Sequence, residues 1–184
     1  MSLITFDRNK RHLTAAEQDL ATSVFKDKLP AWWRIYIGDG LGKDERPYTW
    51  EHLSLFYVLH VGPTIYPDLS VRYRDLLIHE LTHVWQYYNG YWVAPRSVWA
   101  QKFGAGYHYT LDPGTDCWMD FNVEQQARIV EDWFKLGMST EDDRYPFIEM
   151  IIRSWDSGED KEDHGGRASI DRPVQQLREL MKKR

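Results

Sequence analysis

The stretch LLIHELTHVWQYYNG, from Leu76 to Gly90, is the most informative part of this chain. Apolar residues recur along it at helical spacing, as at Leu77, Leu81 and Val84,. The glycine that closes the stretch suits the left-handed conformation that often ends a helix. We therefore predict a long helix over residues 70–89.

The same helix carries His79, Glu80 and His83 in a His-Glu-x-x-His pattern. Residues four apart lie one turn above each other on a helix, so both imidazoles can bind one ion. A hydrolytic zinc site has three protein ligands and an open fourth position for water, whose pKa the ion lowers to roughly 7. Glu80 is then the expected general base. The alternative is a pair of histidines without a metal.

A third ligand must come from elsewhere in the chain. It is not a third histidine six residues on, because Asn89 stands there. We expect Glu124, which opens another predicted helix and has the small Ala127 one turn later. Glu131 and Asp120 are the fallback candidates. The alternative for Glu124 is an acidic residue that the helix dipole favours in a first turn.

The spacing of residues along the chain gives less support to the predicted roles of residues around the metal ligands. A ligating histidine usually donates its other ring N–H to a carboxylate or carbonyl, for which Asp132 and Asp120 are candidates. Hydrolysis also needs a donor for the oxyanion. Tyr107, His108 and Tyr109 lie in a glycine-loosened segment between the two ligand helices and could supply it. Ordinary packing of aromatic residues in a loop is the alternative.

Composition excludes several classes of protein. The net charge is −5, and no stripe of Lys and Arg alternates with aromatics, so nucleic-acid binding is excluded,. The single cysteine, Cys117, has no second thiol for a disulfide or a cysteine-based metal site,. Any metal must therefore be held by histidines and carboxylates. Nine Trp and eleven Tyr predict either a ligand groove or aromatic packing between loops,.

The first residues, MSLITFDRNKRHL, lack the apolar stretch of a secretory signal, and no apolar run reaches the length of a membrane span,. We expect a protein made in the cytoplasm without a signal peptide and without a membrane span. At 184 residues, the chain fits a single domain over 1–184,.

The remaining patterns predict a mainly helical α+β fold with a small sheet. Thr14 and Glu17 form a capping box at the start of one helix,. Further helices are predicted over four segments: 14–29, 122–136, 145–155 and 172–184. Strands are expected over 32–38 and 54–67. Residues 91–119 are predicted to be mostly loop, and residues 157–171 to be a mobile acidic loop.

The segments HELTHVWQ and YHYTLDPGTDCWMDFNVEQQARIVEDWF resemble the neutral zinc metallopeptidase domains associated with type VI secretion. That family includes toxin domains fused to VgrG spike proteins, and the similarity runs from about Leu13 to Phe134. The resemblance implies a zincin-like fold of the gluzincin type. It implies His79 and His83 as zinc ligands, Glu80 as the catalytic base and Glu124 as the third ligand.

The resemblance also implies a function in competition between bacteria. It predicts export by a secretion machine into a rival cell, damage in the periplasm of that cell, and two partners: a VgrG-type spike or other secretion component and a cognate immunity protein. The hypothesis is thus a zinc-dependent peptidase that acts on a protein or peptide substrate. Two alternatives stay open, namely a peptidoglycan amidase or endopeptidase, and a non-enzymatic secretion-machine adaptor with a structural zinc.

Overall fold

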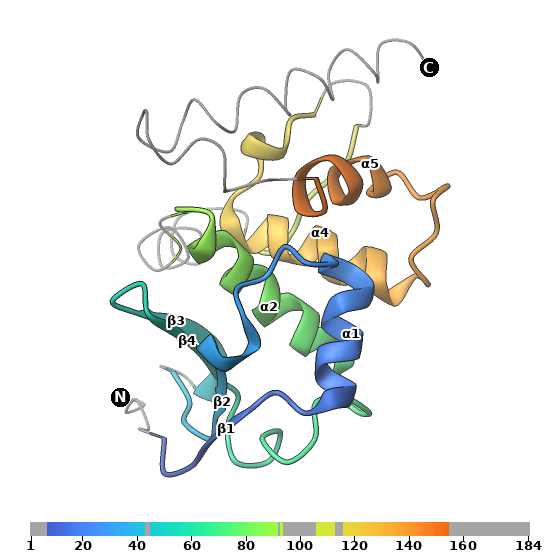
Figure 1. Ribbon diagram of the computed structural model, residues 1–184. Helices are drawn as coiled ribbons and strands as arrows, with labels where there is room; N and C mark the ends of the chain where they lie inside the picture. The colour runs from blue at the N-terminus through green and yellow to red at the C-terminus, as the bar shows by residue number, and fades with distance from the viewer. Residues whose placement is uncertain (1–6, 43–44, 92, 94–105, 113–115, 155–184) are drawn as a thin grey trace.

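The computed structural model describes residues 7–42, 45–91, 93, 106–112 and 116–154. Its central element is helix α2 (Arg74–Tyr88), which lies between a small sheet on one side and helix α4 (Val123–Lys135) on the other (Figure 1). Helix α1 (Ala15–Phe25) also packs against α2. The arrangement mixes helices with a four-stranded sheet, as the α+β prediction requires.

The sheet has the order β1-β2-β4-β3. Its strands are β1 (Lys10–His12), β2 (Ile35–Gly38), β3 (Tyr48–His52) and β4 (Phe56–His60). The central pair, β2 and β4, is parallel, and β1 and β3 are antiparallel edge strands.

The sequence predicted the central strands better than the edges. The strand predicted over 32–38 begins only at Ile35, because Trp32–Arg34 form the 3-10 helix η1. The pattern over 54–67 gives the single strand β4. Neither β1 nor β3 was predicted, since both are short strands that depend on a neighbouring strand for their hydrogen bonds.

The helix ends follow their capping signals. Thr14 and Glu17 form the predicted capping box, but α1 ends at Phe25, before the predicted end near Pro30. Asn122 caps α4, and Gly137 follows that helix with a φ of 88°. The helix predicted over 145–155 is short and partly irregular: α5 (Tyr145–Phe147) continues as a π-helical turn, η4 (Ile148–Ile152).

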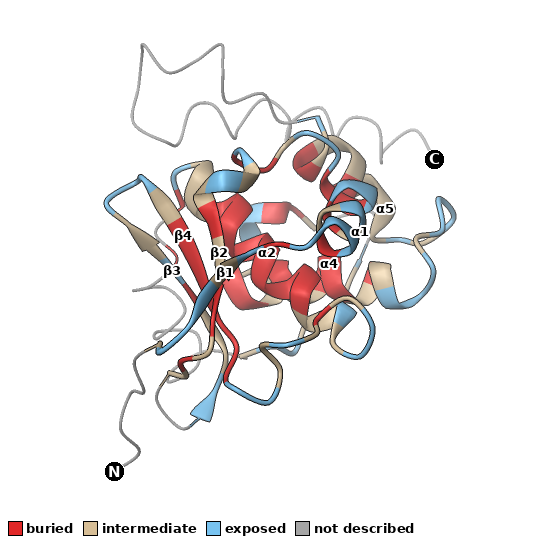
Figure 2. Ribbon diagram, turned by 60° about the horizontal axis from the view of Figure 1, so that its bottom comes forward, coloured by how far each residue is buried: buried red, intermediate tan, exposed pale blue. Residues whose placement is uncertain are grey.

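Helix α2 is buried on every side in its middle. All residues from Leu77 to Gln86 are buried, which is more than one apolar stripe would give (Figure 2). The reason is that the sheet covers one side of α2 while α4 and α1 cover others,. The helix begins at Arg74 rather than at the predicted Ser70, and Gly90, with a φ of 80°, follows its end as predicted.

Several predictions fall on residues outside the described ranges. They are the acidic loop over 157–171, the helix over 172–184 and most of the loop over 91–119. The described end of the predicted loop over 91–119 leads into the 3-10 helix η3 (Trp118–Asp120). No helix within the described residues is long and apolar enough to span a membrane.

Candidate metal centre

The middle of α2 places three polar side chains in the interior of the protein. His79, Glu80 and His83 have relative exposures of 7%, 3% and 5%. Polar groups are buried at a cost unless they have partners. The two imidazole centroids lie 5.0 Å apart with their planes at 83°, so successive turns of the helix direct both rings to one place.

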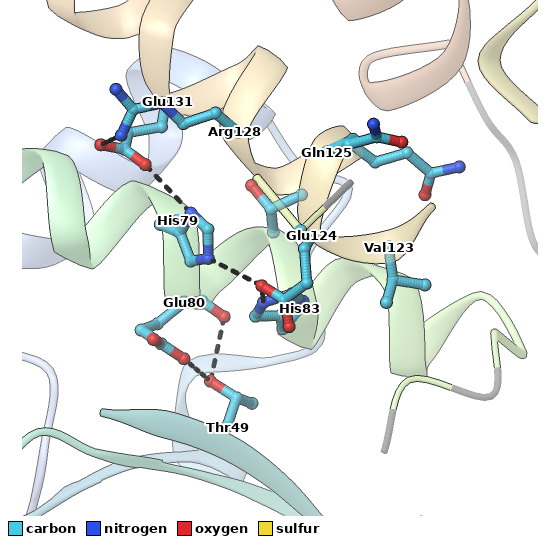
Figure 3. A network of polar contacts seen from close by, with 12 residues as sticks. Thr49, His79, Glu80, His83, Val123, Glu124, Gln125, Arg128 and Glu131 are labelled. Atoms are coloured by element: carbon cyan, nitrogen blue, oxygen red, sulfur yellow. Dashed lines mark hydrogen bonds and ion pairs between the residues drawn. The ribbon is translucent and has the colours of Figure 1, made fainter. Parts of the chain in front are cut away.

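Helix α4 brings Glu124 to the same place. The Asn122 side chain accepts hydrogen bonds from the backbone N–H groups of Glu124 and Gln125, which fixes the first turn of α4. Glu124 Oε2 lies 3.5 Å from Nε2 of His79 and 3.5 Å from Nε2 of His83. Figure 3 shows the carboxylate of Glu124 directed toward both histidines.

This set of donor atoms fits a divalent metal ion. One ligand atom from each of His79, His83 and Glu124 lies within 4.8 Å of the others. In a tetrahedral zinc site, ligand atoms about 2.0–2.1 Å from the ion lie about 3.4 Å from one another. The two separations of 3.5 Å match that spacing. The triad could therefore hold a divalent metal ion.

The ring nitrogens that do not face Glu124, the two Nδ1 atoms, have different partners. His79 Nδ1 lies 3.0 Å from Glu131 Oε2, whereas His83 Nδ1 lies 2.7 Å from Gln86 Oε1. In each ring Nδ1 faces an acceptor, so the neutral imidazole carries its hydrogen on Nδ1 and its lone pair on Nε2, the atom that faces Glu124. The predicted partners Asp132 and Asp120 are wrong.

The carboxylates of Asp120 and Asp132 have other hydrogen-bond partners. Asp120 Oδ2 accepts the backbone N–H of Cys117 at the start of η3. Asp132 accepts a hydrogen bond from the hydroxyl of Tyr109 and pairs with Arg128. Glu131, which was a fallback for the third ligand, instead contacts Nδ1 of His79.

The carboxylates shift the pKa of His79 strongly. Burial by itself would lower this pKa, but the hydrogen bonds with Glu124 and Glu131 outweigh it and raise the pKa to about 10. Burial would conversely raise the pKa of Glu124 and of Glu131, and the histidines reverse that effect. The pKa of Glu124 lies far below its ordinary range and that of Glu131 is lowered to about 2. Glu124 and Glu131 therefore stay ionised beside His79.

Glu131 is itself held by cations. Its Oε1 lies 2.9 Å from Arg128 Nη1 and 2.9 Å from Lys135 Nζ, and Lys135 also pairs with Asp75 at the start of α2. The carboxylate therefore stays in place beside His79.

The sheet also contacts the site. Thr49 of β3 is buried, and its hydroxyl donates a hydrogen bond to Glu80 Oε2 at 2.7 Å (Figure 3). The carboxylate of Glu80 is thereby fixed on the sheet side of α2. Its role as a base stays a prediction.

The three candidates for the oxyanion donor lie in different surroundings. The Tyr107 ring lies 5.9 Å from the His79 ring, centroid to centroid. Burial raises the pKa of Tyr107 to about 12, and the charges of Glu124 and Glu80 add to the rise. The Tyr107 side chain, which is 39% exposed, thus lies next to His79 with its hydroxyl protonated.

The other two candidates have other contacts. The Tyr109 hydroxyl donates to Asp132 and accepts from Arg144 Nε. The His108 side chain is exposed, and its backbone carbonyl accepts a hydrogen bond from Gln125. The structure brings only Tyr107, of these three, into ring contact with a triad residue within the described part of the chain.

Reasoning from sequence missed Gln86, Gln126 and Thr49. Gln86 follows His83 by three residues on the same helix, so helical spacing could have identified it as a neighbour. Gln126 is two residues beyond Glu124, and no periodic signal marks it. Thr49 comes from a strand that was not predicted.

Comparison with known proteins gives two similarities. No protein-family model matches the chain. Over 69 residues the chain is 41% identical to the type VI secretion system spike protein VgrG2b of Pseudomonas aeruginosa. That alignment covers 35% of this chain and 7% of the spike protein, so the chain corresponds to a small part of that relative.

A solved structure matches over a larger share of the chain. The effector domain of Pseudomonas aeruginosa VgrG2b aligns with a TM-score of 0.59 and 29% identity. The alignment covers 76% of this chain and 83% of that domain. This chain therefore shares its fold with the effector domain of a type VI secretion spike protein.

Proposed function

We propose that this protein is a zinc-dependent peptidase with a zincin-like site of the gluzincin type. The observation that carries the proposal is the buried triad of His79, His83 and Glu124, with Glu80 beside the first histidine on the same helix. A His₂Glu ligand set leaves a fourth zinc position open, as catalytic sites require.

The side chains have separate roles in this proposal. His79 and His83 would hold the metal through Nε2, and Glu124 would hold it through its carboxylate. When bound, the zinc ion acts as a Lewis acid that activates water for attack on a peptide carbonyl. Glu80 accepts the proton of that water and later protonates the leaving nitrogen. Tyr107 donates a hydrogen bond to the oxygen that becomes negative on the substrate.

Replacement of Glu80 tests the mechanism. Glu80→Gln keeps the size of the side chain and its contact with Thr49 but cannot accept the proton. We expect the variant to retain stoichiometric zinc and to lose peptidase activity by at least about 100-fold, the lower range for general acid–base catalysis. His79→Ala and Glu124→Ala should lose zinc as well as activity. Normal hydrolysis by Glu80→Gln would refute the assignment.

We further propose that the peptidase is a type VI secretion-associated antibacterial effector. The shared fold with the VgrG2b effector domain and the partial sequence match to the spike protein support this role. In this proposal a secretion machine exports the protein to the periplasm of a target cell. A VgrG-type spike or another secretion component is the delivery partner, and an immunity protein protects the producing cell.

The same catalytic groups would also serve a peptidoglycan amidase or endopeptidase. Purified sacculi separate the two substrate classes. Release of muropeptides by the wild type, absent with Glu80→Gln, would identify the cell wall as the substrate, whereas cleavage of proteins alone would identify a protease.

A further inference from the structure

The two glutamines that the catalytic proposal leaves without a role form a buried network beside the metal ligands. Gln86 of α2 and Gln126 of α4 have relative exposures of 0% and 2%. Buried amides of this kind are retained in proteins when all their hydrogen-bonding groups have partners. Their partners show what the network does.

The Gln86 amide contacts both sides of the triad. Its Oε1 lies 2.7 Å from Nδ1 of His83. Its Nε2 donates to the backbone carbonyl of Val123, the residue before Glu124, at 3.0 Å. One side chain therefore links a ligand histidine on α2 to the backbone that presents the ligand carboxylate on α4.

Gln126 fixes which way the Gln86 amide faces. The second N–H of Gln86 Nε2 donates to Gln126 Oε1 at 2.9 Å. Gln126 Nε2 in turn donates to the backbone carbonyls of Trp118 and Phe121, at 3.0 and 3.1 Å. Turning either amide over would place oxygen against oxygen, so each orientation is determined by the network.

The fixed amides determine the tautomer of His83. Because Gln86 presents an oxygen, Nδ1 of His83 must carry the hydrogen, and the lone pair is at Nε2. That atom is the one that lies 3.5 Å from Glu124 Oε2. In His79 the atom facing Nδ1 is a carboxylate oxygen, Glu131 Oε2.

We propose that Gln86, oriented by Gln126, is the positioning residue that presents Nε2 of His83 to the metal. The inference rests on the proposed zinc site and concerns metal binding rather than the substrate. It assigns a role to the second glutamine of the Glu-Gln-Gln-Ala segment; the first, Gln125, accepts the backbone N–H of Asn122 in the capping box of α4.

Two substitutions at Gln86 separate positioning from simple structural support. Gln86→Met keeps the length of the side chain but removes the acceptor for His83, and should weaken zinc binding roughly 10- to 100-fold. Gln86→Glu keeps an acceptor for His83 and removes the donors to Val123 and Gln126. It should bind zinc much more tightly than Gln86→Met. Zinc affinity is measured by competition with a chromogenic chelator.

Thr82→Val is the matched control. Thr82 is also buried on α2, and its hydroxyl donates to the carbonyl of Ile78 within the same helix. Loss of the Thr82 hydroxyl should leave the zinc affinity unchanged. If Gln86→Met binds zinc like the wild type, or if Gln86→Glu is as weak as Gln86→Met, Gln86 only joins the helices and the proposal is overturned.

A measurement on the wild type does not depend on whether the variants fold. Nuclear magnetic resonance of the ¹⁵N-labelled, zinc-loaded protein should show His83 with zinc on Nε2 and a slowly exchanging hydrogen on Nδ1. Zinc on Nδ1, or a rapidly exchanging Nδ1 hydrogen, would overturn the inference. A protein that shows the expected spectrum but cleaves no peptide bond would refute the proposed peptidase and leave this inference intact.

Discussion

At the scale of single residues, the chemistry of the site depends on the hydrogen-bond partners of the proposed metal ligands. The sequence predicted His79, His83 and Glu124 as a set, because spacing on a helix and a first-turn position are local properties. The partners of the two Nδ1 atoms could not be predicted in this way. Glu131 reaches His79 only because α4 packs on α2, and three-dimensional packing of that kind leaves no periodic mark in the sequence.

The loss of zinc affinity on acidification should begin at a higher pH than it would for histidines with an ordinary pKa. The ion must displace the proton from His79, whose pKa is raised to about 10. Below that pH, each unit of decrease should weaken zinc affinity by up to about tenfold. A histidine with its ordinary pKa would place this loss near pH 6.5. We expect a marked fall in affinity between pH 8.5 and pH 7 in chelator-buffered titrations.

Glu131→Gln is the matched variant for this test. It removes one of the two carboxylates that raise the pKa of His79, so the loss of affinity should begin at a lower pH than in the wild type. An affinity that stays constant from pH 8.5 to pH 7 in the wild type would contradict the raised pKa.

At the scale of elements, α2 and α4 form the unit that builds the site. The start of α4 and the ends of both helices followed from local signals, namely the Asn122 cap and the glycines after the helices, whereas the start of α2 did not. The edge strand β3 was missed, although it supplies Thr49 to hold Glu80. A strand of that length takes its hydrogen bonds from its neighbour, so its stability is not encoded in its own residues.

Close approach of α2 and α4 should be sensitive to Ala127. This residue is fully buried one turn after Glu124. Ala127→Leu adds volume to a packed interior, which typically costs about 1–3 kcal/mol. We expect a lower free energy of unfolding in urea and weaker zinc binding, because the larger side chain pushes Glu124 away from the histidines.

Ala16→Leu on the exposed face of α1 provides the comparison. It adds the same volume without a buried contact and should change the free energy of unfolding by no more than about 0.5 kcal/mol. Equal effects of the two substitutions would show that Ala127 does not control the spacing of the helices.

At the scale of the whole molecule, the sheet and the helices enclose α2 so that the triad lies in the interior. The sequence predicted a fold with both helices and a small sheet, but it did not predict the strand order β1-β2-β4-β3. The parallel pairing of β2 with β4 joins segments separated along the chain by β3, and only the complete packing selects it. The shared fold with the VgrG2b effector domain extends over most of this chain.

The proposed role as an exported effector predicts toxicity in one compartment. Expression directed to the periplasm of a susceptible bacterium should inhibit growth, whereas expression in the cytoplasm should not. Glu80→Gln should abolish the inhibition, because it removes catalysis without removing the metal. Inhibition that persists in Glu80→Gln, or that occurs only in the cytoplasm, would contradict the proposed role.

The most direct test of the central claim is a crystal structure of the zinc-loaded protein, with the metal located by anomalous scattering at the zinc edge. We predict one zinc ion bound by His79 Nε2, His83 Nε2 and Glu124, with no protein atom at the fourth position. A fourth protein ligand would indicate a structural zinc, and zinc bound away from this triad would contradict the proposed site.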